Sequence, residues 1–365
     1  MTRIPLVDLA AAHAEVAEEV EAGFKRIIAE TAFIGGPEVA AFEKEYAEFS
    51  GVEHCIGVAN GTDALELAFR AVGVGPGTEV ILPANTFIAT AEAVARTGAK
   101  VVLVDCDPRT YLIDVDAALA AVTPATKAIA PVHLYGQLAP VEQLRAGLAG
   151  RDDIVIVEDA AQSQGATRHG IGSGVHGIAA TSFYPGKNLG AYGDAGAVTT
   201  ASADWATTVR TLGSHGGLRK YHHDLVGVNS RLDGLQAVVL RAKLARLAGW
   251  NDRRRAAAAR YAELLAGFDD VVLPATLDGN EHVWHIFCIR VPRRDEVLAS
   301  LNAAGVGAAI HYPIPVHKTG AFASLGGSFP NAEKVAPEIL SLPIYPQITA
   351  DQQEAVVQAL SVALR

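Results

Sequence analysis

The sequence is poor in cysteine and in charged residues. Only three of its 365 residues are cysteines, and Cys55, Cys106 and Cys288 stand far apart without CxxC spacing. This argues against a disulfide-stapled scaffold and indicates a reducing compartment. Charged residues make up 19% of the chain and hydrophobic residues 50%, a composition that excludes an intrinsically disordered chain.

An excess of positive charge and a long apolar run are also missing. The formal net charge of −10 argues against a general nucleic-acid binder, and the arginines at 253–255 read as the solvated face of a helix. No uncharged run approaches the roughly 18–20 residues that a membrane span requires, and the first residues lack the apolar segment of a signal peptide. We therefore expect a soluble, cytoplasmic protein without a nucleic-acid or membrane partner.

The length and the pattern of apolar segments predict two domains. Single cores stop growing near about 250–300 residues, so we expect a large domain over 1–248 and a smaller α+β domain over 249–365. Between 79 and 157, short apolar strands alternate with helices, which is typical of a mainly parallel sheet covered on both faces. The predicted fold class is therefore α/β.

Several other elements can be predicted from periodicity and turn residues. We expect helices over 14–30 and 232–247, a further helix through Tyr261 and Leu265, and a carboxyl-terminal helix from Ala350. Strands are expected over 283–291 and 308–311.

Two acidic residues follow the apolar strand over 154–157. In parallel sheets ligands gather at the carboxyl ends of the strands. Because side chains alternate along a strand, only one of Glu158 and Asp159 can face such a site.

A glycine turn opens the helix that follows the strand near Cys55. The free N–H groups at a helix start suit a phosphate, and Thr62 adds a hydroxyl. The alternative is that Thr62 or Asp63 only caps the helix.

A single lysine, Lys187, lies in a glycine-rich loop between two apolar, strand-like runs. A desolvated lysine is a nucleophile that forms Schiff bases with carbonyl compounds such as pyridoxal phosphate. The alternative is an ordinary solvated loop lysine.

Two sequence patterns resemble ligand-binding motifs but do not predict a site. The GxGxxG match over 172–177 is not preceded by a buried strand and is followed by a strand, so we do not interpret it as a dinucleotide site. His222 and His223 lack a carboxylate or cysteine at ligand spacing, so we predict no metal site.

Four segments together resemble one family. Gly61-Thr62, the segment over 158–162, the segment over 182–187 and the segment over 227–233 occur in the order and spacing of the DegT/DnrJ/EryC1/StrS sugar aminotransferases. The resemblance runs nearly end to end. It implies the fold-type I, aspartate aminotransferase-like architecture, a homodimer with shared active sites, and pyridoxal phosphate as cofactor with pyridoxamine phosphate as its aminated form.

The resemblance also implies roles for individual residues. Lys187 would attach the cofactor covalently and move the proton, and Asp159 would pair with the pyridinium nitrogen. Gln162 would touch the cofactor, and Phe87 would stack on its ring unless it is a buried core residue. Asp159 could instead cap the next segment.

The remaining site residues would bind the phosphate and the substrates. Gly61, Thr62, Ser182 and the partner subunit's Asn229 would hold the phosphate, with Asp63 in the same helix turn. The expected substrate-binding residues are Tyr221, Arg231, His311 and Tyr312. Arg231 could instead form an interface salt bridge, and Tyr312 could be a core residue.

The implied reaction is transfer of the amino group of L-glutamate to C3 of a nucleotide-linked keto sugar. We favour a dTDP-3-keto-6-deoxyhexose over UDP-3-keto-N-acetylglucosaminuronate or a 4-keto sugar. Relatives that dehydrate sugars carry histidine where Lys187 stands, which disfavours that branch. A non-catalytic cofactor-binding protein is a further alternative.

Overall fold

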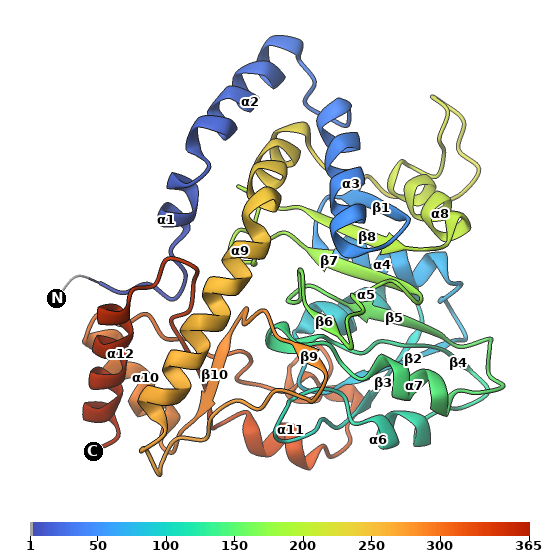
Figure 1. Ribbon diagram of the computed structural model, residues 1–365. Helices are drawn as coiled ribbons and strands as arrows, with labels where there is room; N and C mark the ends of the chain where they lie inside the picture. The colour runs from blue at the N-terminus through green and yellow to red at the C-terminus, as the bar shows by residue number, and fades with distance from the viewer. Residues whose placement is uncertain (1–2) are drawn as a thin grey trace.

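A seven-stranded sheet forms the centre of the computed structural model, which describes residues 3–365 (Figure 1). The strand order is β1-β8-β7-β5-β4-β2-β3, and only β8 runs against its neighbours, so the predicted mainly parallel sheet is confirmed. The strands are β1 (His54–Val58), β2 (Glu79–Pro83), β3 (Lys100–Val104), β4 (Thr126–Ile129), β5 (Val155–Asp159), β7 (Ile178–Ser182) and β8 (Gly196–Thr200).

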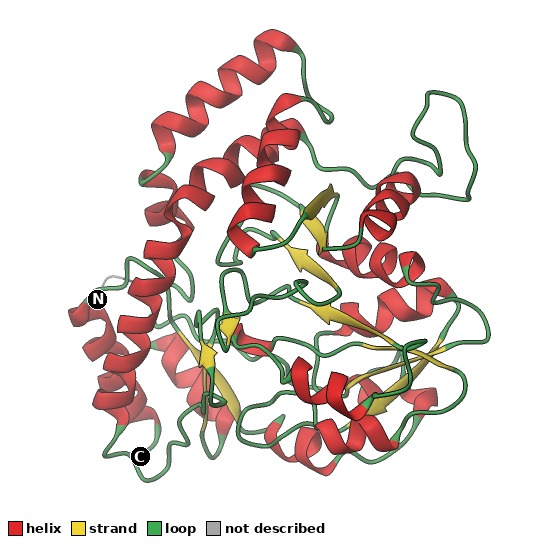
Figure 2. Ribbon diagram, turned by 45° about the vertical axis from the view of Figure 1, so that its right-hand side comes forward, coloured by secondary structure: helices red, strands yellow, loops and turns green. Residues whose placement is uncertain are grey.

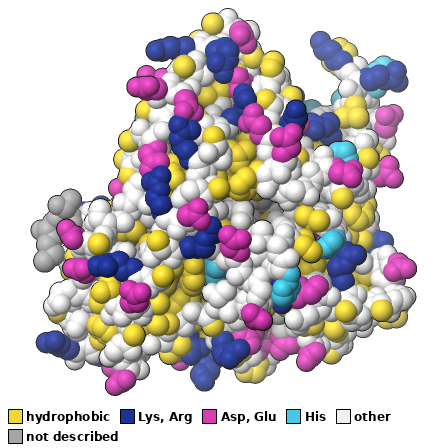
Figure 3. Space-filling view, in the orientation of Figure 1, with side chains coloured by type: hydrophobic (Ala, Val, Ile, Leu, Met, Phe, Trp, Pro, Cys, Tyr) yellow, Lys and Arg dark blue, Asp and Glu magenta, His cyan; other side chains and the backbone are white. Residues whose placement is uncertain are grey.

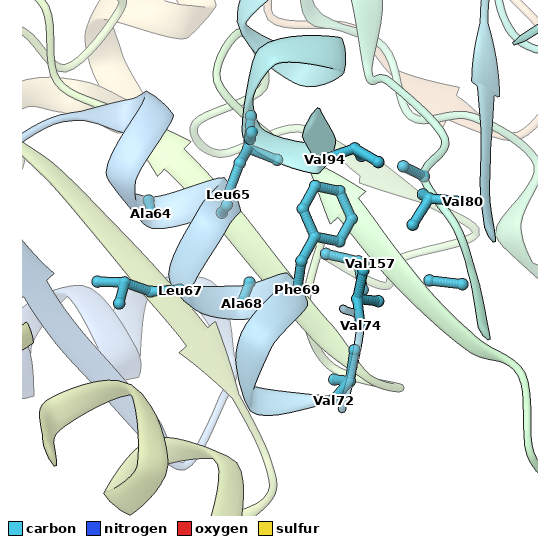
Figure 4. Close-up of a cluster of buried hydrophobic side chains, with 14 of the residues drawn as sticks. Ala64, Leu65, Leu67, Ala68, Phe69, Val72, Val74, Val80, Val94 and Val157 are labelled. Atoms are coloured by element: carbon cyan, nitrogen blue, oxygen red, sulfur yellow. The ribbon is translucent and has the colours of Figure 1, made fainter. Parts of the chain in front are cut away.

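Helices cover both faces of this sheet, as Figure 2 shows. On one face α4 (Gly61–Ala71) packs with α5 (Ile88–Thr97) and α8 (Ala203–Gly213), and Phe69 of α4 is fully buried beside Val80, Val94 and Val157 (Figure 4). On the other face lie α6 (Val115–Ala120) and α7 (Val141–Gly147). Apolar strands that are buried on both faces account for the continuous hydrophobic runs in the sequence.

One long helix replaces two predicted ones. Helix α9 (Gly234–Leu265) is continuous for 32 residues and runs from the large sheet into the carboxyl-terminal part of the chain (Figure 1). The prediction of separate helices was wrong because Gly249 and the polar residues after it interrupt the apolar pattern without breaking the backbone. Trp250 and Tyr261 are buried by different parts of the fold, so packing sustains the helix across the interruption.

The carboxyl-terminal part has a core of its own. Helices α10 (Arg294–Ala303) and α12 (Ala350–Ala363) pack with the end of α9 and with the antiparallel pair β10 (Phe287–Arg290) and β11 (Ile339–Leu342). The chain start joins this core, because Ile4 is buried in it and bridges to Val306. The boundary predicted at residue 248 lies inside α9, and the division into 1–248 and 249–365 remains a proposal.

Other boundaries differ from the predictions. The segment over 308–311 forms only an isolated bridge from Ala309 to Ser341. The helix predicted over 14–30 is α2 (Ala17–Glu30), and the separate short helix α1 (Leu9–Ala14) precedes it. The remaining elements are α3 (Pro37–Ser50), β6 (Thr167–Arg168), β9 (Asn280–Glu281), α11 (Pro330–Val335) and three short 3₁₀ turns at 134–136, 316–318 and 323–325.

Two features project from the body of the molecule. Helix α2 extends to the top of the view in Figure 1, and the loop over 214–229 extends beside α8, with basic and histidine side chains at its tip in Figure 3. Large apolar side chains are exposed on both, among them Ile28, Leu218 and Val226. Exposed apolar groups on projecting elements are typical of an interaction surface.

The continuity of α9 predicts the effect of substitutions at Gly249. A methyl group there meets no atom within 4 Å, so Gly249→Ala should stabilise the protein by about 0.5–1 kcal/mol, whereas Gly249→Pro should cost about 3 kcal/mol. Urea unfolding measures both. A destabilising Gly249→Ala variant would contradict a continuous, exposed helix at this position.

Candidate active site

A cavity of about 720 Å³ lies at the carboxyl ends of β5 and β7. Ten of the thirteen predicted site residues line it: Gly61, Thr62, Asp63, Phe87, Asp159, Gln162, Ser182, Lys187, His311 and Tyr312. The large sheet, the loop after β7 and the carboxyl-terminal part all contribute to its wall. The fold therefore brings together residues that are far apart in the sequence.

Lys187 enters the cavity from the loop after β7. Its backbone N–H donates to the carbonyl of Tyr184 at 2.8 Å, which forms a tight turn under the side chain. Burial lowers the pKa of Lys187 to about 8, and the nearby charge of Asp159 opposes part of that effect. A larger fraction of unprotonated amine is therefore present near neutral pH than in a solvated lysine.

Asp159 is the last residue of β5 and faces the cavity. Its Oδ2 accepts a hydrogen bond from the Thr90 hydroxyl at 2.7 Å, and its Oδ1 accepts from the backbone N–H of Ala161 at 3.2 Å. Burial raises the pKa of Asp159, while these hydrogen bonds and Lys187 work in the opposite direction. The bond to Ala161 shows that the carboxylate also caps the turn after the strand.

Glu158 points away from the cavity, as strand alternation requires. It accepts hydrogen bonds from His133 Nε2 at 2.8 Å and from the backbone N–H of Gly174 at 2.9 Å. The two neighbouring acids therefore have separate surroundings.

Gln162, Tyr312 and Phe87 form a connected group at one side of the cavity. Gln162 donates to the Tyr312 hydroxyl at 3.0 Å and accepts from the backbone N–H of Tyr135 at 2.6 Å. The ring of Phe87 lies 5.0 Å from that of Tyr312 and is 49% exposed, so Phe87 is not a buried core residue. Its open ring face can receive a flat ligand.

His311 lies beside Tyr312, with Nδ1 2.8 Å from the Ser341 hydroxyl. Burial and the charge of Lys187 lower the pKa of His311 to about 4. The imidazole is therefore neutral at physiological pH.

The start of α4 forms the other end of the cavity. The predicted caps Thr62 and Asp63 were wrong, because Asn60 caps the helix and its Oδ1 accepts from the N–H of Asp63 at 2.8 Å. The N–H groups of Gly61 and Thr62, in the first turn, have no helical partner. A Cβ at Gly61 would lie 2.5 Å from Cβ of Ser182, so only glycine lets the helix start approach the end of β7 this closely.

Several lining residues were not predicted, among them Arg96 and His285. Arg96 reaches the cavity from the end of α5, where it forms ion pairs with Glu66 at 2.7 Å and Asp63 at 3.4 Å. His285 comes from the segment before β10. Neither has a local sequence signal, because each reaches the cavity only through tertiary packing.

Three predicted residues lie outside the cavity of their own chain. Tyr221 is 82% exposed on the projecting loop, and Asn229 and Arg231 are exposed near its base. No salt bridge involves Arg231 within the described residues.

Comparisons with known proteins bear on this arrangement. A model of the DegT/DnrJ/EryC1/StrS aminotransferase family matches residues 14–361. The dTDP-3-amino-3,4,6-trideoxy-alpha-D-glucose transaminase of Streptomyces venezuelae is 45% identical over 98% of this chain and 95% of its own. The UDP-N-acetyl-3-dehydro-alpha-D-glucosamine 3-aminotransferase of Acidithiobacillus ferrooxidans is 48% identical over 96% of this chain and 95% of its own.

The chain belongs to the DegT/DnrJ/EryC1/StrS aminotransferase family. The crystal structure of Streptomyces venezuelae DesV with a ketimine intermediate superposes with a TM-score of 0.97 at 44% identity, covering all of both chains. The structure of NtdA from Bacillus subtilis with bound cofactor PMP superposes with a TM-score of 0.91 at 32% identity, covering 100% of this chain and 86% of that one. The fold-type I architecture and the aminotransferase class predicted from the sequence are confirmed.

The aminotransferase uses pyridoxal phosphate, and the cavity fits this cofactor. The open helix start at Gly61 suits its phosphate, and the carboxylate of Asp159 suits a protonated ring nitrogen. When bound, the cofactor supplies a ring that accepts electrons from the substrate carbon.

The described residues contain neither a metal-binding cluster nor a helix suited to span a membrane. Within residues 3–365, no three side chains of the metal-binding types gather into a cluster. No helix in the same range has the length and apolar character needed to cross a membrane.

Proposed function

We propose that the protein transfers the amino group of L-glutamate to C3 of a nucleotide-linked 3-keto sugar, with a dTDP-3-keto-6-deoxyhexose as the favoured acceptor. The products are 2-oxoglutarate and the 3-amino sugar. The observation that carries the proposal is the placement of Lys187, with its lowered pKa, in one cavity with Asp159 and the open start of α4.

The roles of the residues follow from this placement. Lys187 would hold the cofactor covalently and, as a free amine, would accept the proton that the substrate carbon loses. Asp159 would pair with the protonated ring nitrogen, and Thr90 holds the carboxylate in place. Phe87 and Gln162 would orient the ring, while Gly61, Thr62 and Ser182 would bind the phosphate.

The apolar part of the cavity wall favours a 6-deoxy sugar. Leu6, Val7 and Ile344 contribute an apolar wall, which suits the C6 methyl group of a 6-deoxy sugar. In the described part of the chain, Lys187 and Arg96 are the cations that line the cavity, and Arg96 already pairs with two acids. The carboxylates of glutamate, and that of a uronate, would therefore bind a cation from a partner subunit, which the position proposed below for Arg231 supplies.

A UDP-linked 3-keto sugar is the second candidate. The Acidithiobacillus relative, whose name specifies such a substrate, matches this chain at 48% identity. His311 and Tyr312 offer polar contacts that either sugar could use.

We also propose that the active protein is a cytoplasmic homodimer with shared active sites. The three cysteines are unpaired, in keeping with a reducing compartment. Asn229, Arg231 and Tyr221 are exposed outside their own cavity, which supports a position at the partner's cavity for each. Asn229 would reach the partner's cofactor phosphate, and Arg231 and Tyr221 its substrate.

An optical experiment tests the reaction. L-glutamate should bleach the visible band of the cofactor-loaded protein, and a dTDP-3-keto-6-deoxyhexose should restore it, whereas a 4-keto isomer should not. A matched run with UDP-3-keto-N-acetylglucosamine distinguishes the two candidate sugars. Failure of glutamate to bleach the band would reject the proposed donor, and recovery only with the 4-keto sugar would reject the C3 assignment.

Mixed dimers test the shared site. The Lys187→Ala and Asn229→Ala variants should each have low activity alone, the first because the covalent link is lost and the second because the cofactor binds more weakly. If Asn229 acts in the partner's cavity, a dimer of one subunit of each variant has one cavity with both residues intact. Such a mixed dimer should therefore have up to about half of the activity of a wild-type dimer. Mixed dimers with no recovery would show that both residues serve the same cavity. Lys187→Ala mixed with wild type is the control for harm done by an inactive subunit, because the number of intact cavities, and so the total activity, should not change on exchange.

A further inference from the structure

His285 lies in the cavity with Lys187 and is 9% exposed. It comes from the segment between β9 and β10, and its Nδ1 lies 3.2 Å from Oδ1 of Asn188, the residue after Lys187. One contact therefore joins His285 to the residue that follows Lys187 in the chain.

Hydrogen bonds to two backbone carbonyls set the orientation of the neighbouring amides. Asn188 Nδ2 donates to the carbonyl of Val283 at 2.9 Å and to Oδ1 of Asn251 at 3.0 Å, and Asn251 Nδ2 donates to the carbonyl of Gln164 at 3.0 Å. A carbonyl can only accept, so both amides have one possible orientation. Oδ1 of Asn188 consequently faces His285 as an acceptor.

This orientation determines the tautomer of His285. An acceptor opposite Nδ1 requires the proton on Nδ1. Burial and the charges of Lys187, Arg254 and His311 hold the pKa of His285 well below its usual value, so the ring is neutral. Nε2 then carries a lone pair and no proton.

We propose that His285 is a positioning residue whose unprotonated Nε2 accepts a hydrogen bond from the ε-amino group of Lys187 while that amine is free. The inference rests on the role of Lys187 in the proposed function. A bond from one N–H of the amine to Nε2 would restrict rotation of the side chain and direct its own lone pair toward the reacting carbon. His285 would not exchange a proton itself.

The groups that face Lys187 come from several elements. Asp159 at the end of β5 favours the charged amine, whereas burial disfavours it. His311 and His285 are neutral, and Arg254 approaches His285 from α9. Asp194, Tyr184 and Tyr312 also line the cavity. The neutral His285, as a hydrogen-bond acceptor, would therefore stabilise the ammonium form of Lys187 in addition to Asp159.

Competitive labelling of Lys187 in the cofactor-free, full-length chain tests the proposal without any sugar substrate. Acetic anhydride modifies only the free amine, and mass spectrometry reports the rate at Lys187 as a function of pH. His285→Asn keeps a donor toward Asn188 but withdraws the acceptor from the cavity, so the ammonium form of Lys187 loses a hydrogen bond. The pH midpoint of the labelling rate at Lys187 should therefore fall by about one pH unit, the size expected for losing one hydrogen bond to a charged group.

His285→Gln is the matched variant, because it can present an acceptor oxygen near the position of Nε2. It should restore the wild-type midpoint. An unchanged midpoint in His285→Asn, or a lowered midpoint that His285→Gln does not restore, would overturn the proposal. If His285→Asn unfolds, ¹⁵N-histidine spectra of the wild-type protein decide the matter, because a protonated Nε2 at His285 contradicts the assignment and an unprotonated one supports it.

The same data separate this inference from the proposed function. If the labelling midpoint of Lys187 shifts as expected in the His285 variants but no 3-keto sugar is turned over, the proposed substrate is rejected and the positioning role of His285 stands. If a 3-keto sugar is turned over but the labelling midpoint of Lys187 does not shift, only the role of His285 is rejected.

Discussion

The candidate active site depends on the removal of Lys187 from water beside the carboxylate of Asp159. Burial lowers the pKa of the lysine to about 8 and raises that of the aspartate, and each charge partly offsets the effect on the other. A buried amine without an anion nearby would be neutral but loosely placed, and a buried carboxylate without donors would be protonated. In this pair the carboxylate favours the charged amine, and the hydrogen bond from Thr90 favours the charged carboxylate.

The fold produces this pair through two close approaches. The ends of β5 and β7 place Asp159 and the Lys187 loop at one edge of the sheet, and the missing side chain of Gly61 lets the start of α4 reach Ser182. The cavity thus has a carboxylate at its base and free N–H groups at one end. Residues near both chain termini, including Leu6 and Ile344, close it from the other side and join this apolar wall to the carboxyl-terminal core.

Much of this arrangement was predictable from local sequence. Strand alternation indicated that only one of Glu158 and Asp159 would face the cavity, and the glycine turn before α4 indicated the helix start that lines one end of it. The interruption at Gly249 misled the prediction, because packing at both ends of α9 overrides a local break. Asn60 was missed as the cap because Thr62 and Asp63 carry the same local signal.

The contributions of Arg96 and His285 could not be predicted. Both depend on contacts between segments more than 30 residues apart, and the tautomer of His285 depends on two backbone carbonyls that fix the orientation of neighbouring amides. Residues on the projecting loop raise a different difficulty. Their proposed partner is another copy of the chain, so neither the periodicity of one chain nor its own packing locates their contacts.

Identification of the lysine that carries the cofactor tests the central claim most directly. Lys243 is a real competitor, since burial also lowers its pKa to about 8, although its Nζ donates to the carbonyl of Gly190 at 2.6 Å. Borohydride reduction of the cofactor-loaded protein, followed by peptide mass spectrometry, reports the attachment site. We expect a pyridoxyl group on Lys187 alone, and a label on Lys243, on another lysine or on none would contradict the role of Lys187.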